Sequence, residues 1–245
     1  MEMLSNPDIW LSFATLAALE IVLGVDNLVF ISIVAGKLPE HQQPLARRIG
    51  LGAALIMRIL MLLAISWILG LKEPVFTAFE TAVSWRDIIL IGGGLFLLVK
   101  GTLEIHHAME GDHGDDKAKK PTASFAMVIA QIMALDLIFS LDSIITAVGM
   151  TDEIAVMIAA VCTAMAVMMF AAGPVSDFIQ RHPTTKMLAL SFLLLIGVAL
   201  IADGLHFHIP KGYLYFAIAF SIIVESLNLA ARAAAKKRRE SKAAH

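Results

Sequence analysis

The chain has 245 residues, of which 58% are hydrophobic and only 16% are charged, and its mean hydropathy is +0.79. Soluble domains are about 45–50% apolar and about 25% charged, so this composition excludes an ordinary soluble protein and indicates an integral membrane protein. The net charge is −2, and Cys162 is the single cysteine, which excludes intramolecular disulfides and thiolate metal clusters.

Seven apolar stretches are long enough to cross a hydrocarbon core of ~30 Å, which takes ~20 helical residues. Glu2 and Asp8 precede the first one without any Lys or Arg, the reverse of a signal peptide, so we expect that span to be retained. Pro174 is predicted to kink or end the fifth span. The spans are expected at about 9–35, 48–70, 87–105, 123–148, 154–178, 187–204 and 213–231.

The basic residues predict the orientation of these spans. Fifteen of the 19 Lys and Arg fall in the segments on one side, and three fall on the other, with Arg58 inside the second span. Positive charge is retained in the cytoplasm, so the N-terminus is predicted outside and the C-terminus inside. Trp10, Trp85 and Tyr213 stand near predicted external ends, as interfacial anchors do.

A motif in the first span recurs in the fourth. EIVLGVDNLVF at 20–30 aligns with DLIFSLDSIIT at 136–146 after a shift of 116 residues. Three spans separate the copies, so they run in opposite directions and predict a 3+3 inverted repeat with one C-terminal helix left over. The shift pairs Glu20 with Asp136, Gly24 with Ser140, Asp26 with Asp142, and Asn27 with Ser143.

Helix geometry leaves two arrangements of each motif open. On an ideal helix the first acid, the small residue and the polar residue share one face, whereas Asp26 or Asp142 points about 120° away. Either each helix is buried on two sides, or it unwinds around Gly24 and Ser140. Unwinding would free backbone carbonyls as further oxygen ligands.

Four carboxylates inside the spans would cost on the order of 10–14 kcal/mol if nothing compensated them. A bound cation, pairing with Arg58 or Lys100, or protonation could each offset this cost. One arginine cannot balance four acids, so a cation site is favoured over a structural Asp–Arg network or a metal-free proton relay. The ligands are hard oxygens, and no His or Cys stands beside them in the spans, which favours Mn²⁺, Mg²⁺ or Ca²⁺ over zinc or copper.

The chain resembles the TerC family of integral membrane proteins over nearly its whole length. The resemblance lies in LEIVLGVDN at 19–27, LDLIFSLDSIITAVGM at 135–150, RHPTTKMLALSFLLLIG at 181–197 and HIPKGYLYFAIAFSIIVESLN at 208–228. It is that of a short form, without the C-terminal CBS and transporter-associated domains of longer relatives. The family takes its name from tellurium resistance, and several members are regarded as manganese exporters within the lysine-exporter superfamily. Asp203 departs from the pattern, which has Glu there.

The resemblance implies that the two motifs handle metal. The implied metal residues are Glu20, Asp26, Asn27, Asp136, Asp142 and Ser143, with Arg58, Ser140 and Glu225 as counter-ion or accessory residues. The leading hypothesis is a secondary transporter that exports Mn²⁺ across the bacterial plasma (inner) membrane. Mn²⁺, or Ca²⁺ or Mg²⁺, is then the transported ion and not a cofactor. The sequence has no ATP-binding P-loop, so protons or membrane potential would drive transport, and carboxylates could exchange protons for metal.

Two other classes of function remain as alternatives. A non-transporting membrane factor could supply metal to exported proteins or organise a membrane complex. An intramembrane aspartyl protease is disfavoured because its Tyr-Asp and Gly-x-Gly-Asp contexts are missing, so we expect no enzyme.

The expected organisation is one transmembrane domain. It consists of repeat one at about 9–105, a polar cytoplasmic linker at about 106–122, repeat two at about 123–204, the seventh helix at about 213–231 and a basic cytoplasmic tail at 232–245. The linker contains His106, His107 and His113 and is interpreted as solvated chain rather than a metal-collecting loop. The tail fits an anchor near anionic lipid and not a nucleic-acid surface.

Overall fold

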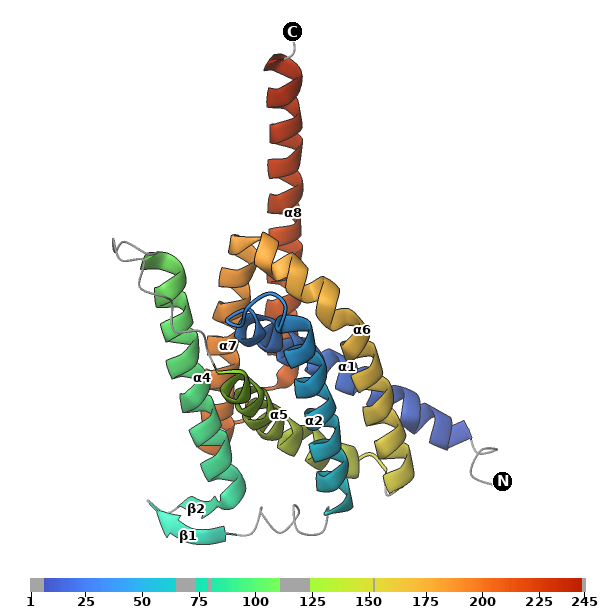
Figure 1. The fold of residues 1–245 in the computed structure, drawn as a ribbon. Coiled ribbons are helices and arrows are strands. Elements are labelled where there is room, and N and C mark those ends of the chain that lie inside the picture. Colours follow the sequence, from blue (N-terminus) through green and yellow to red (C-terminus); the bar gives the residue numbers. More distant parts are fainter. Residues whose placement is uncertain (1–6, 65–73, 79–80, 111–123, 152, 244–245) are drawn as a thin grey trace.

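The computed structural model describes residues 7–64, 74–78, 81–110, 124–151 and 153–243. Within helices some side chains also lie outside the description, those of Asp26 and Asp142 among them. The described chain is nearly all helical, as predicted (Figure 1). Its long helices are α1 (Pro7–Ala35), α2 (Gln43–Leu63), α4 (Trp85–Glu110), α5 (Phe125–Val148), α6 (Ile154–Arg181), α7 (Pro183–Gly204) and α8 (Lys211–Ala243).

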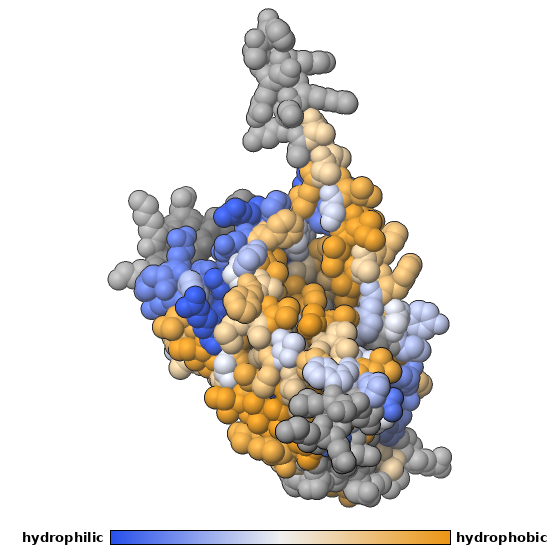
Figure 2. Space-filling view, turned by 90° about the vertical axis from the view of Figure 1, so that its right-hand side faces the viewer, coloured by the Kyte–Doolittle hydropathy of each residue, from blue (hydrophilic) through white to orange (hydrophobic). Residues whose placement is uncertain are grey.

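Six of these helices are long and apolar enough to cross a membrane; α2 is not among them. It carries Arg47, Arg48 and Arg58 within 21 residues, and residues 65–70 of the predicted second span lie outside the described part. Apolar residues dominate the side of the molecule seen in Figure 2, as expected for a surface that faces lipid.

Helix ends follow the local sequence, with some corrections. Pro44 and Pro183 stand in the first turns of α2 and α7, where a missing N–H costs nothing. The seventh span, expected at about 213–231, matches the apolar stretch Gly212–Arg232, and the helix α8 continues beyond it to Ala243 because the tail is rich in the strong helix formers Ala, Lys and Arg. Likewise α4 reaches Glu110 and not 105, and residues 111–123 of the predicted linker lie outside the described part.

Pro174 does not end the fifth span, which was one of the two outcomes predicted for it. The helix α6 runs through Pro174 to Arg181. It bends toward its C-terminal end (Figure 1). A proline inside a helix removes one backbone hydrogen bond without necessarily ending the helix when tertiary packing holds both sides.

A short hairpin precedes α4, where the sequence predicts only a loop. Strands β1 (Pro74–Ala78) and β2 (Thr81–Ser84) pair antiparallel, with Ala78 opposite Thr81. The strands contain Val, Phe and Thr, which favour extended backbone. Ser84 then begins α4 as a capping box: its backbone N–H and hydroxyl both donate to Oδ2 of Asp87, at 2.9 and 2.7 Å.

The packing of the helices follows the predicted inverted repeat. The repeat makes α1, α2 and α4 the counterparts of α5, α6 and α7. Each helix packs against its own counterpart: α4 along α7, α1 on α5, and α2 on α6. In addition, α1 packs on α6 and α2 packs on α5. Replacing each helix by its counterpart in the other half converts the first of these contacts into the second. The described contacts therefore have the pattern of a pseudo-two-fold arrangement.

Two glycines mark where α4 and α7 meet. A Cβ atom at Gly94 would lie 2.5 Å from the carbonyl oxygen of Gly197, and one at Gly197 would lie 3.0 Å from that of Gly94. Only glycine lets two backbones approach this closely. The contact joins equivalent helices of the two halves, so it lies on the pseudo-two-fold axis.

The contacts on either side of this glycine pair follow the same pseudo-two-fold symmetry. A Cβ at Gly101 would meet Leu194 at 2.7 Å, and one at Gly204 would meet Ile91 at 2.6 Å. A shift of 103 residues converts the first pair into the second and also carries Gly94 to Gly197. This shift is shorter than the 116 residues of the motifs because the first half contains the hairpin before α4.

Candidate functional site

The two motifs lie on continuous helices. The helical backbone extends through Gly24 in α1 and through Ser140 in α5, so of the two arrangements left open the structure has the unbroken one. Gly24 has a packing explanation, since a Cβ there would lie 2.2 Å from Sδ of Met168 on α6. Ser140 donates its hydroxyl to the backbone carbonyl of Asp136, one turn earlier.

Close packing of α2 on α5 positions Arg58. A Cβ at Gly50 would lie 2.9 Å from Cδ1 of Ile132, so the two helices approach closely there. Two turns after Gly50 on the same face stands Arg58, and one turn after Ile132 stands Asp136. The two side chains are thereby brought opposite one another in the buried interior.

Arg58 pairs with the first acid of both motifs. Its Nη2 donates to Oδ1 of Asp136 at 2.6 Å, and its Nε lies 3.0 and 3.1 Å from the two oxygens of that carboxylate. Its Nη1 donates to Oε2 of Glu20 at 2.6 Å. Glu20, Arg58 and Asp136 are 2%, 3% and 5% exposed, respectively. One arginine thus bridges two carboxylates that the repeat relates.

The polar residues of the motifs complete this network. Asn27 donates its Nδ2 to Oδ1 of Asp136 at 3.2 Å, a direct bond between the two halves. The Ser140 hydroxyl oxygen also lies 3.1 Å from Oδ2 of Asp136, and Ser143 donates to the carbonyl of Ser140 at 3.3 Å. Sequence reasoning predicted these residues as one site, and the structure brings Glu20, Asn27, Arg58, Asp136, Ser140 and Ser143 together.

The network leaves negative charge and one acceptor uncompensated. Two carboxylates face one guanidinium, so the described groups carry a net −1 when all are ionised. Oδ1 of Asn27 is buried and has no hydrogen-bond partner among the described atoms. Such a group costs about 1–3 kcal/mol unless something supplies a donor or a cation.

Two predicted metal residues are placed only by their backbone. Asp26 and Asp142 lie on α1 and α5, but their side chains are outside the described part. Within the part that is described, no group of three or more His, Cys, Asp or Glu is close enough to hold a metal ion. Nζ of Lys100, the other candidate counter-ion, lies 5.9 Å from the ring centre of Phe96 on its own helix, and the described acids of the network pair with Arg58 instead.

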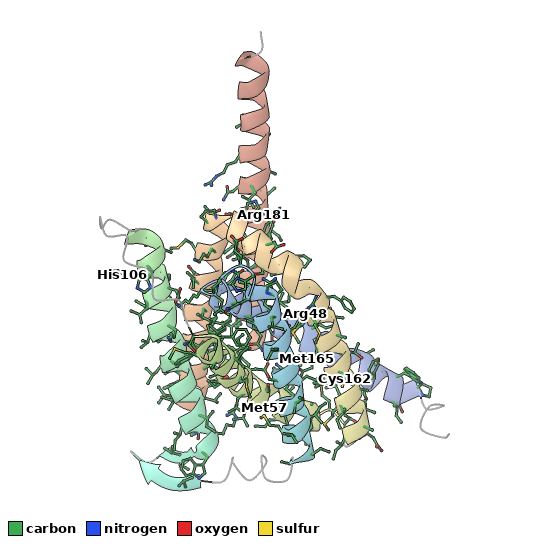
Figure 3. The ribbon with its side chains drawn as sticks, viewed as in Figure 1. Arg48, Met57, His106, Cys162, Met165 and Arg181 are labelled. Carbon is green, nitrogen blue, oxygen red and sulfur yellow. The ribbon has the colours of Figure 1, made fainter. Side chains whose placement is uncertain are left out.

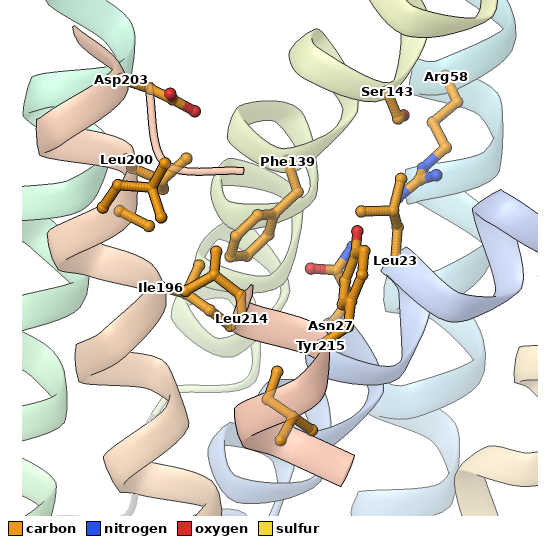
Figure 4. A pocket seen from close by; sticks show the side chains of 13 residues that line it. Leu23, Asn27, Arg58, Phe139, Ser143, Ile196, Leu200, Asp203, Leu214 and Tyr215 are labelled. Atoms are coloured by element: carbon orange, nitrogen blue, oxygen red, sulfur yellow. The ribbon is translucent and has the colours of Figure 1, made fainter. Parts of the chain in front are cut away.

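A cavity of about 80 Å³ opens beside the network, between α1, α5, α7 and α8. The repeat-related Asn27 and Ser143 both line it, together with Arg58. In Figure 4 these three lie on one side and Asp203 on the other, with Phe139 between them. The cavity therefore reaches both motifs at once.

Asp203 is a cavity residue that sequence reasoning did not include in the site. Only 16% of its side chain is exposed, and its Oδ1 is 3.2 Å from Nδ1 of His208. The departure from the family pattern at this position was the available signal. Glu225, predicted as accessory, instead accepts a hydrogen bond from Thr184 of α7 and does not line this cavity.

Comparison with known proteins identifies relatives along nearly the whole chain. The family model described as "Integral membrane protein TerC family" matches residues 5–240. A UPF0053 protein of Haemophilus influenzae is 50% identical over 231 residues, covering 94% of this chain and 98% of its own. The UPF0053 inner membrane protein YgdQ of Escherichia coli K12 is 52% identical over 226 residues, covering 92% and 94%.

A longer relative matches over the same region. The UPF0053 inner membrane protein YoaE of Escherichia coli K12 is 53% identical over 232 residues, which is 95% of this chain but only 45% of YoaE. No solved structure matches the chain.

Proposed function

The chain belongs to the TerC family of integral membrane proteins, and from this and the joined motifs we propose that it is a secondary transporter of divalent cations. The proposed ion is Mn²⁺, exported across the inner membrane, where the names of its relatives YgdQ and YoaE place those proteins. Substrate sites of inverted-repeat transporters lie where the two halves meet.

One observation carries the proposal. The bond from Asn27 to Asp136 joins the two repeat-related motifs in the buried interior, beside a cavity lined by Asn27 and Ser143. Structural ion pairs alone would not require an unpartnered buried amide oxygen at that cavity. A hard cation is a chemically suitable partner for that oxygen.

The proposed ligands are hard oxygens from both motifs. Asp26 and Asp142 would supply the negative charge, and Asn27 and Ser143 would be neutral ligands. Glu20 and Asp136 would also bind the metal ion once their ion pairs with Arg58 open. An oxygen ligand set favours Mn²⁺, Mg²⁺ or Ca²⁺ over metals that prefer sulfur or imidazole. Among these three, the family resemblance favours Mn²⁺.

Arg58 has a specific place in this proposal. A metal-free site with several carboxylates would repel itself, and a guanidinium inside the site offsets that repulsion. Arg58 is the internal cation that pairs with Glu20 and Asp136 while no metal is bound. Metal entry then weakens these pairs, and proton exchange at the carboxylates supplies the coupling.

The test is Mn²⁺ flux into proteoliposomes that contain a quenchable dye, under pH gradients of both signs. We expect flux by the wild type, and its loss in Asp26→Asn and Asp142→Asn at unchanged thermal stability. Asp177→Asn is the matched control, since Asp177 is an exposed acid on α6 away from the motifs. Its flux should equal that of the wild type.

Absence of wild-type flux under either gradient would contradict transport. If the same protein still bound Mn²⁺ and co-purified with partners, the alternative function, a membrane factor that supplies metal to exported proteins or organises a complex, would take its place. Flux of Ca²⁺ or Mg²⁺ in preference to Mn²⁺ would keep the transporter and change its substrate.

A further inference from the structure

A second cavity, of about 240 Å³, lies between the start of α2 and the C-terminal half of α6. We call it the α2–α6 groove. Its position is at the predicted cytoplasmic ends of these helices, away from the paired motifs; Figure 3 labels Arg48 on α2, where α2 lies beside α6. The lining residues used below are Pro44, Arg47, Arg48, Met169, Phe170 and Gly173.

Arg47 is a buried cation without an acid. It is 9% exposed, and its Nη1 donates to the neutral hydroxyl of Ser176 at 2.8 Å. Among the described side chains no carboxylate lies within ion-pair distance of Arg47 or of its neighbour Arg48. Arg58, by contrast, has two. A buried charge without a counter-charge is costly, so an anion from outside the chain would stabilise this arrangement.

The beginning of α2 adds to the positive potential of the groove. Gln42 makes no side-chain cap to the first-turn N–H groups, and the first turn contains no acidic residue. Unsatisfied N–H groups and the helix dipole both favour an anion at this end. Pro44 of this turn lines the groove itself, so the two arginines and the helix start act on the same space.

The opposite wall of the groove is apolar and open. Phe170 and Met169 of α6 line this wall and are 85% and 40% exposed. A Cβ at Gly173 would meet nothing within 4 Å, so the wall is not filled by neighbouring side chains. The groove thus has a positively charged part and an apolar part. A small inorganic anion would bind the first but leave the apolar surface exposed.

We propose that the α2–α6 groove binds the headgroup of an anionic phospholipid of the cytoplasmic leaflet. The phosphate accepts hydrogen bonds from Arg47 and Arg48, and an acyl chain lies over the exposed side chains of Phe170 and Met169. Basic pockets between membrane helices on the cytoplasmic side suit such headgroups. The inference does not depend on metal transport, since none of these residues belongs to the paired motifs.

The test uses the full chain purified in detergent and measures binding of phosphatidylglycerol, phosphatidylcholine and inorganic phosphate by thermal shift and native mass spectrometry. Arg48 is exposed and has no described partner, so Arg48→Gln should fold. We expect preferential phosphatidylglycerol binding by the wild type and a loss of about fivefold in Arg48→Gln. Arg181→Gln, an exposed arginine at the end of α6 outside the groove, is the matched control and should bind as the wild type does.

Equal binding of phosphatidylcholine, or undiminished phosphatidylglycerol binding in Arg48→Gln, would overturn the proposal. An equal loss in Arg181→Gln would do so too, because it would show general attraction to a basic surface. Inorganic phosphate that stabilises the protein as well as the lipid does would replace the lipid with a free anion.

Discussion

Arg58 and Asp136 face each other across α2 and α5 with both oxygens of the carboxylate within 3.1 Å of the guanidinium. Glu20 of α1 takes the remaining side of the same arginine. Three helices from both halves of the repeat therefore converge on one cation. Removing one member of such a buried set leaves the others uncompensated.

Arg58→Gln is expected to lower the free energy of unfolding by about 3–5 kcal/mol, because it leaves two carboxylates buried without their counter-ion. The triple variant Glu20→Gln, Asp136→Asn and Arg58→Gln removes all three charges and should be more stable than the single one. Thermal unfolding in detergent measures both. A triple variant less stable than Arg58→Gln would contradict the pairing.

Gly94→Ala is expected to destabilise the protein, since the new Cβ would meet the backbone oxygen of Gly197 at 2.5 Å and neither helix can withdraw freely. Overpacking of this kind costs about 1–3 kcal/mol. Gly92→Ala is the matched control on the same helix, with nothing within 4 Å of its Cβ. It should be neutral or stabilise by up to about 1 kcal/mol through helix propensity. Equal melting temperatures for the two variants would refute the close contact.

His206 ends α7 with a left-handed backbone, φ 64°, at a position where glycine is usual. The backbone N–H of Phe207 donates to the carbonyl of Ala202 and that of His206 donates to the carbonyl of Asp203, which together form a Schellman motif. Nε2 of the His206 ring lies 3.2 Å from Oδ2 of Asp87. His206→Gly loses the ring contact but relieves the backbone, whereas His206→Ala loses the contact and keeps the strain. We expect His206→Ala to be less stable than His206→Gly by about 1 kcal/mol in thermal unfolding. The reverse order would argue against this backbone conformation.

The predicted orientation can be tested with single cysteines in a Cys162→Ala background. Met109, near the end of α4, and Tyr213, near the start of α8, are 72% and 71% exposed. A membrane-impermeant maleimide should label Tyr213→Cys in intact cells. Met109→Cys should be labelled only after permeabilisation, because its end of α4 is predicted to be cytoplasmic. The opposite pattern would invert the topology.

The sequence was sufficient for the order of the helices and for the pairing of the motifs. Long apolar runs have few alternatives in a membrane, and the shift of 116 residues related Glu20 to Asp136 before any contact was known. The sequence also indicated Arg58 as a possible counter-ion. Which acids it reaches could not be predicted, because that depends on the approach of α2 to α5 at Gly50.

Features that depend on irregular backbone were missed. The β hairpin stood in a predicted loop, although the Ser84–Asp87 capping box after it has a recognisable Ser-x-x-Asp spacing. The cavity at Asp203 requires the α7–α8 turn to fold back, and that turn uses His206 where the pattern would require glycine.

The contact between Gly94 and Gly197 has a consequence for the origin of the fold. Because equivalent helices of the two halves touch each other, each half has a surface complementary to a copy of itself in the opposite orientation. A separate three-helix ancestor, inserted into the membrane in both directions, would assemble as an antiparallel homodimer through that same surface. Gene duplication and fusion would then fix the two orientations in a single polypeptide and leave each half free to diverge. Arg58 in α2 is an example of such divergence, because the counterpart helix α6 has no basic residue before Arg181.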